Sequence, residues 1–135
     1  MAYSSATWTA FYEKLAYLFY GIAYADGTIE AKEEEAVKSL LKEVWLDVES
    51  SVNEFGDDAA YQTAVVFDWL TDVSPDTEQA LAQFEEFVTD HPGFLTPQLK
   101  TLVLDSANRI ASAFRGRNKA ELAQLVHLDR FLKAN

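Results

Sequence analysis

The sequence predicts an all-α protein, a compact single-domain bundle that spans residues 1–135 and contains about six helices. Three observations lead to this prediction. Apolar residues recur at helical spacing along most of the chain, no segment alternates like a strand beside hairpin turn residues, and capping residues fall where helices would begin and end. With 49% apolar residues among 135, the chain can also bury a core of its own.

The first predicted helix runs from Ser5 to Ala25. Its apolar stripe consists of Trp8, Phe11, Tyr12, Leu15, Leu18, Phe19 and Ile22. Tyr17, Tyr20 and Tyr24 lie on the opposite face. These tyrosines indicate either an aromatic patch for a partner or a central helix that is buried on both sides, and we expect the central helix.

The second predicted helix runs from Glu30 to Val52. Its stripe consists of Val37, Leu40, Leu41, Val44 and Val48. Gly56-Asp57-Asp58 then interrupts the pattern and caps a third helix, which continues through Leu70. The apolar positions of the third helix are Tyr61, Val65, Val66, Trp69 and Leu70.

Proline and capping residues mark the remaining helices. Ser74-Pro75 predicts the start of a fourth helix, with the serine as cap and the proline in the first turn, and Asp90-His91-Pro92-Gly93 ends it. Thr96-Pro97 repeats this start for a fifth helix, which ends at Gly116. Asn118 with Glu121 resembles a capping box at the start of a sixth helix, which runs through the leucines up to Leu132.

Two helix–glycine–helix junctions share part of their sequence. Ile22-Ala23-Tyr24-Ala25-Asp26-Gly27 compares with Ile110-Ala111-Ser112-Ala113-Phe114-Arg115-Gly116. Because both segments end a predicted helix at glycine, the similarity favours a degenerate pseudo-duplication of the bundle.

Composition and charge exclude several classes of function. The chain has no cysteine, which excludes disulfides, thiolate zinc sites and cysteine nucleophiles. A net charge of −11 repels phosphate backbones and anionic lipids, so we expect no nucleic-acid binding and no membrane insertion. It favours cations or a basic protein partner, whose identity the sequence leaves open together with the oligomeric state. Met1 to Thr9 has no basic n-region of a secretory signal, and we expect a cytoplasmic protein.

The candidate site is a group of carboxylates at the turn between the first two predicted helices, here called the acidic junction. Its members are Asp26, Glu30, Glu33 and Glu34. At 100° per residue, its three glutamates fall within about 60° of the stripe direction set by Val37. Glu35, Lys38 and Lys42 point away from that stripe, as solvated side chains should. A carboxylate that faces the core needs a partner, because it has lost water.

Three kinds of partner could satisfy the acidic junction. The dipole of the second helix would stabilise acids in its first turn by about 0.3–1 kcal/mol each. Alternatively, Ca²⁺ or Mg²⁺ could bind the carboxylates together with carbonyl oxygens around Gly27 and Thr28, since these ions prefer oxygen ligands. Arg115 or Arg117 could instead neutralise the acids, if the two similar junctions lie side by side.

Residues Ala23-Tyr24-Ala25-Asp26-Gly27-Thr28-Ile29, followed by a glutamate-rich helix start, resemble the signature of the TerB-like (tellurite-resistance) family. The resemblance implies a compact all-α bundle and a metal site at Asp26, Glu33 and Glu34, with Glu30 adjacent. It also implies an association with tellurite and other chemical stress responses. Arg115-Gly116-Arg117 stands where some relatives carry a second Asp-Gly turn, so a second metal site is not expected.

Other polar residues indicate no second site. Asp68 and Asp72 lie one turn apart on the third helix, as a carboxylate pair or, as we expect, on its solvated side. His91 and His127 have no cysteine or second histidine at metal-ligand spacing, and we expect them to be structural or exposed.

The sequence therefore predicts a non-enzymatic module that binds a partner protein. A divalent cation at the acidic junction, or an Arg in its place, would fix the angle between the first two helices and so shape the partner surface. It contains no nucleophile elbow, phosphate-binding glycine loop or His-Glu-x-x-His motif. Two alternatives remain open: a metal-dependent hydrolase that uses the same carboxylates, and a structural subunit of an assembly.

Overall fold

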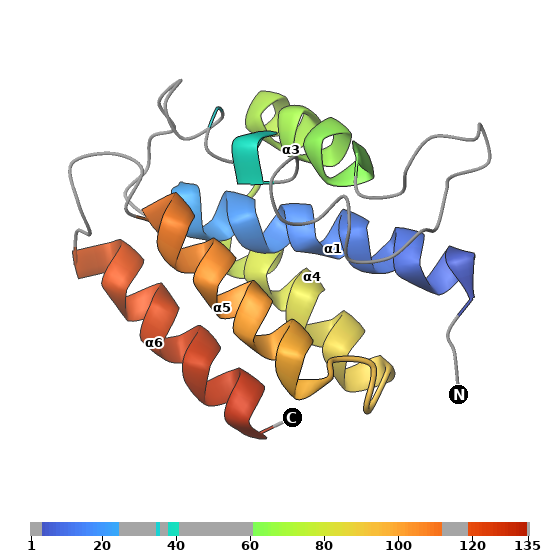
Figure 1. Ribbon diagram of the computed structural model, residues 1–135. Helices are drawn as coiled ribbons and strands as arrows, with labels where there is room; N and C mark the ends of the chain where they lie inside the picture. The colour runs from blue at the N-terminus through green and yellow to red at the C-terminus, as the bar shows by residue number, and fades with distance from the viewer. Residues whose placement is uncertain (1–3, 25–34, 36–37, 41–60, 112–118, 135) are drawn as a thin grey trace.

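A computed structural model describes residues 4–24, 35, 38–40, 61–111 and 119–134, and the observations below concern these residues. They form a compact helical bundle, and no strand occurs among them (Figure 1). The predicted all-α class is therefore confirmed. None of the helices in these ranges is long and apolar enough to cross a membrane.

The first helix lies at the centre of the bundle. The helices are α1 (Ser5–Ala23), α3 (Tyr61–Val73), α4 (Thr77–Asp90), α5 (Pro97–Ala111) and α6 (Lys119–Ala134). Figure 1 shows α3 on one side of α1, and α4, α5 and α6 on the other. Because α1 contacts each of these helices, most of its side chains from Phe11 onward are buried on every face. This confirms the expectation of a central helix.

Capping explains where α1 begins and ends. The Ser4 side chain accepts a hydrogen bond from the Thr7 backbone N–H at 3.2 Å, so the helix begins at Ser5 as predicted. It ends at Ala23 rather than at Ala25. Tyr24 follows as the C-cap, and its N–H donates to the Tyr20 carbonyl at 2.9 Å.

The predicted start of α4 at Ser74-Pro75 is wrong. Ser74 has φ 49°, in the left-handed region, and its N–H donates to the Leu70 carbonyl at 2.8 Å. Ser74 therefore terminates α3, because a left-handed residue closes a helix and cannot cap the next one. Asp76 is the N-cap of α4, and its carboxylate accepts the Glu78 N–H at 2.7 Å.

The predicted start of α5 is correct. The Thr96 hydroxyl accepts the Leu99 N–H at 3.2 Å, and Pro97 is the first helical residue. The predicted cap of α3 at Gly56-Asp57-Asp58, the predicted end of the fifth helix at Gly116 and the capping residue Asn118 lie outside the described residues. Of the second predicted helix, Glu35 and Lys38, Ser39 and Leu40 are described, and all four are helical.

Two hydrogen bonds orient α3 along α1. The buried Thr63 hydroxyl donates to the Tyr12 carbonyl at 2.7 Å, and the Tyr20 hydroxyl donates to the Pro75 carbonyl at 2.8 Å. Since both partners advance along the chain from one bond to the next, α3 runs in the same general direction as α1. Phe67 and Leu70 are buried in the interface between them.

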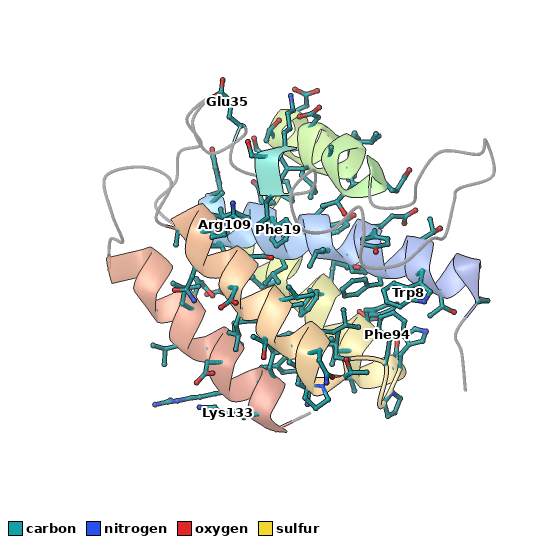
Figure 2. All side chains as sticks on the ribbon, viewed as in Figure 1. Trp8, Phe19, Glu35, Phe94, Arg109 and Lys133 are labelled. Carbon is teal, nitrogen blue, oxygen red and sulfur yellow. The ribbon has the colours of Figure 1, made fainter. Side chains whose placement is uncertain are left out.

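An aromatic cluster fills the end of the core near the start of α1 (Figure 2). Its members are Trp8, Phe11, Tyr12, Phe87 and Phe94. Phe94, in the turn between α4 and α5, lies with its ring centre 4.9 Å from that of Trp8. The cluster thus joins the start of α1 to the end of α4 and the turn that follows it.

The two similar junctions of the sequence begin with buried residues. Ile22 and Ala23 at the end of α1, and Ile110 and Ala111 at the end of α5, are all fully buried. Their shared Ile-Ala therefore has a packing role in both helices. The rest of each junction, apart from Tyr24, lies outside the described residues, and the pseudo-duplication stays a prediction.

Candidate functional site

The acidic junction lies outside the described residues. This applies to Asp26, Glu30, Glu33 and Glu34, and to Gly27, Thr28, Arg115 and Arg117. The described neighbours agree with the phase used to predict it: Leu40 is 1% exposed, whereas Glu35 and Lys38 are exposed. Figure 2 shows Glu35 extending away from the helices. That the acids of the junction face the core remains a prediction.

Within the ranges that the structure describes, no three His, Cys, Asp or Glu side chains come together in a way that could hold a metal ion. Asp68 and Asp72 are exposed, as expected for a solvated side of the helix.

The most prominent exposed feature is a row of apolar side chains along α3, here called the α3 ridge. Val65 is 61% exposed, Trp69 53% and Val73 50%. At a spacing of four residues these side chains lie one above the other on the helix surface. Single exposed apolar residues are ordinary, but three in line form a row, which makes the ridge a candidate interaction surface.

The sequence pattern gives the apolar positions of the third helix without separating the buried ones from the exposed ones. Val65 and Trp69 face solvent, and the buried side of α3 instead carries Thr63, Phe67 and Leu70. The available signal was an excess of apolar residues: α3 has more of them than one buried face can hold. The missed residue at the end of the ridge is Val73.

A cleft of about 200 Å³ opens beside the ridge, between α1, α3 and α4. It is lined by Tyr17, Trp69, Leu70, Val73, Pro75, Gln79, Ala80 and Gln83. Small-molecule pockets usually measure about 300–1,000 Å³. The cleft is therefore better matched to a side chain of a protein partner than to a complete small-molecule ligand.

Charge is distributed unevenly around the cleft. On the α3 side, Asp68 and Asp72 are exposed next to the ridge. On the α1 side, the Lys14 ammonium donates to Gln83 Oε1 at 2.8 Å and lies 5.1 Å from the centre of the Tyr17 ring. Among the described residues, exposed carboxylates thus lie beside the ridge on α3, and a hydrogen-bonded ammonium lies near the cleft on the α1 side.

The buried Tyr20 and the partly buried Tyr24 lie behind one wall of the cleft. The Tyr20 ring stacks on the Tyr24 ring, with ring centres 5.3 Å apart. The Tyr20 hydroxyl donates a hydrogen bond to the carbonyl of Pro75, which lines the cleft. Burial raises the pKa of the Tyr20 hydroxyl above its ordinary value, and the neighbouring Tyr24 and Asp76 raise it further. The neutral, hydrogen-bonding form of Tyr20 is therefore the one that the fold stabilises.

We expect the stabilising effect of Tyr20 to disappear at high pH. Since the pKa of Tyr20 is higher in the folded than in the unfolded chain, its contribution is complete below about pH 10 and falls as the pH rises through the folded value. Urea unfolding of the wild type and of Tyr20→Phe should therefore give a difference in unfolding free energy that is unchanged from about pH 8 to pH 10 and narrows above about pH 10. A difference that stays constant up to about pH 11 would contradict the assignment.

A second hollow, of about 380 Å³, lies between α4 and α6. It is lined by Glu78, Leu81, Ala82, Glu85, Ala123, Gln124 and His127. His127 Nε2 lies 2.6 Å from Glu85 Oε1, and the His127 side chain is 60% exposed. Because exposed pairs contribute about 0–1 kcal/mol, this contact is a surface link between two helices.

Both histidines fit their expected roles. His127 is exposed. The His91 ring stacks on Phe87 at 4.2 Å between ring centres, and its Nδ1 lies 2.9 Å from the Phe87 carbonyl oxygen. These contacts secure the end of α4, so His91 has a structural role.

Comparisons with protein-family models, with curated proteins and with solved structures find no match to this chain. The resemblance to the TerB-like family therefore depends on the motif at the start of the second predicted helix. The site that can be argued from geometry is the α3 ridge with its cleft.

Proposed function

We propose that this chain is a non-enzymatic, TerB-like helical module that binds a partner protein through the α3 ridge and the adjacent cleft. The observation that carries the proposal is the alignment of Val65, Trp69 and Val73, each at least 50% exposed, along one side of α3. Tryptophan is enriched among the residues that contribute most to protein–protein binding, and burial of such a row on association is favourable.

The packing of α3 against α1 favours binding without a change in the conformation of α3. Phe67 and Leu70 on the opposite side of α3 are buried, and Thr63 is hydrogen-bonded to the Tyr12 carbonyl of α1. The contacts with α1 thus fix the position of α3, and with it the ridge, before any partner binds. A preformed surface loses less conformational entropy on association, which leaves more of the contact energy for affinity.

Affinity capture from cells that express the natural partner tests this proposal. The baits are the wild-type chain, the double variant Trp69→Ser/Val73→Ser and the control Val126→Ser, which alters an apolar residue of α6 that is 45% exposed. We expect a protein that the wild type and the control retain and that the ridge variant loses. Calorimetry with that protein, once purified, should then show at least about a tenfold loss of affinity for the ridge variant. Identical captures by all three baits would overturn the proposal.

We also propose that the acidic junction binds Ca²⁺ or Mg²⁺ and so fixes the angle between the first two helices. The support is the predicted convergence of Asp26, Glu30, Glu33 and Glu34, together with the resemblance. With so few side-chain ligands, we expect a dissociation constant of about 10⁻⁴–10⁻³ M.

Calorimetric titration and thermal shifts with each ion check this prediction. Asp26→Asn should weaken binding by about tenfold or more, because it removes one charged ligand. Asp72→Asn is the control, since Asp72 is an exposed carboxylate on a different helix. The absence of both heat and thermal shift with either ion, in protein freed of metal by chelation, would contradict the metal site.

Two other functions, a metal-dependent hydrolase and a structural subunit, can be distinguished from partner binding by experiment. A metal-dependent hydrolase would show activity in an esterase and phosphatase screen with added metals, and that activity would be abolished by Glu33→Gln. A structural subunit would form a discrete oligomer in light scattering that is insensitive to chelator. The ridge does not support the hydrolase, because an exposed apolar row is a feature of surfaces that bind proteins.

A further inference from the structure

We propose that the partner segment bound by the α3 ridge is a basic amphipathic helix. Its apolar row packs against Val65, Trp69 and Val73, and its Lys or Arg side chains lie against Asp68 and Asp72. The inference depends on the proposed function and specifies the chemistry of the partner.

The shape of the ridge favours a helical occupant. Val65 and Val73 are eight positions apart, which on a helix corresponds to about 12 Å along the axis. A helix surface has no free backbone edge to which a strand could be added, so the partner must be bound through side chains. Side chains four residues apart form a ridge that fits into the groove between two such ridges on another helix. One large apolar side chain of that second helix would fill the 200 Å³ cleft.

The charges beside the ridge favour a basic occupant. Asp68 and Asp72 each follow a ridge residue by three positions, Val65 and Trp69 respectively, so they lie on the adjacent row of α3. Neither carboxylate forms an ion pair with any residue in the described ranges. Cations along one edge of a docked helix would therefore meet two available carboxylates.

Net charge argues against the other possible occupants. A second copy of the chain would also carry a net charge of −11, so the two molecules would repel each other. If the two ridges met, the Asp68 and Asp72 carboxylates of one copy would also repel those of the other. The same charge repels anionic membranes and nucleic acids. Lys14, held by Gln83, places the positive charge of the cleft on the α1 side, so we expect the cations of the partner on the α3 side.

Two designed helical peptides of about 18 residues test the inference with the full-length chain. Both carry the same leucine row, and their polar faces consist of lysine in one and glutamate in the other. We expect the lysine peptide to bind at least about tenfold more tightly than the glutamate peptide, with binding that weakens as salt rises. Titration calorimetry gives the affinities, and amide chemical-shift changes should cluster on α3.

Variants of the chain distinguish binding of the lysine peptide at the α3 ridge from its general electrostatic attraction to an acidic protein. Val65→Ser/Trp69→Ser should weaken the lysine peptide by at least about tenfold, and Asp68→Asn/Asp72→Asn by about threefold or more. The matched control is Glu86→Gln/Asp90→Asn, an exposed pair with the same spacing on α4, and it should change affinity by less than about twofold.

The inference is overturned if the two peptides bind equally, if neither binds, or if the α4 pair matters as much as the α3 pair. A concentration-dependent dimer that Trp69→Ser abolishes would show that the occupant is a second copy. If a captured partner needs the ridge but docks without basic residues, this inference fails and the proposed function stands. If no captured protein needs the ridge, the proposed function itself fails.

Discussion

Replacement of Phe11 by alanine is expected to lower the free energy of unfolding by about 4 kcal/mol. Phe11 is fully buried, and its ring centre lies 5.2 Å from that of Phe94 and 6.0 Å from that of Phe87. Its removal takes away the apolar contacts that join the start of α1 to the end of α4. The neighbouring rings belong to different elements and cannot all close on the cavity, so the cavity cost adds to the lost transfer energy.

Urea unfolding followed by circular dichroism measures this loss. Phe11→Leu should lose less than half as much, because most of the volume remains. The surface control Val126→Ala, at a position that is 45% exposed, should change the unfolding free energy by less than about 0.5 kcal/mol. A loss of under about 1.5 kcal/mol for Phe11→Ala would contradict the packing of the aromatic cluster.

The core of α1 was predictable because helical geometry leaves few choices. The stripe members Phe11, Leu15 and Ile22 are fully buried, as their spacing requires. The pattern does not determine which tyrosines on the opposite face of α1 are buried. Tyr20 is buried and hydrogen-bonded to Pro75, whereas Tyr17 borders the cleft. Which tyrosine was covered depended on how α3 and α4 meet, which periodicity within one helix does not encode.

Two nearly identical start signals had different outcomes for a physical reason. Thr96-Pro97 begins α5, but Ser74-Pro75 does not begin α4. The difference lies in the left-handed backbone of Ser74, which still belongs to the end of α3. A dipeptide shows that a helix boundary is near, and the conformation of the preceding helix end decides which residue becomes the cap. Asp76, two residues later, was available as a competing N-cap.

The α3 ridge could not be assigned from the sequence, because burial of an apolar side chain depends on its neighbours in space. Trp69 and Leu70 are adjacent and both apolar, yet Trp69 is 53% exposed and Leu70 is fully buried against α1. The sequence did indicate a partner-binding module, through charge and resemblance. The surface that we propose for the partner depends on α1 covering the other face of α3, which the sequence does not encode.

The packing of α1 against α4 leaves no room for a side chain at Gly21, and we expect Gly21→Val to lower the free energy of unfolding by about 3 kcal/mol. A Cβ built on Gly21 would lie 2.6 Å from Leu81 Cγ and 2.6 Å from Leu81 Cδ2. Gly21 is fully within the helix, where glycine is about 1 kcal/mol less favourable than alanine. This intrinsic cost is outweighed because the missing side chain allows α4 to approach α1 closely.

A double-mutant cycle with Leu81 tests whether this contact is the cause. Leu81→Ala removes the atoms that the new side chain meets, so Gly21→Val should be less damaging in that background by at least about 1 kcal/mol. Gly21→Ala in the same background should approach neutrality, since the gain in helix propensity then offsets the remaining strain. Equal costs of Gly21→Val in both backgrounds would show that the close approach of α4 does not explain the glycine. Because α4 also contributes Gln79 and Gln83 to the lining of the cleft, this contact belongs to the helix pair that borders the proposed binding surface.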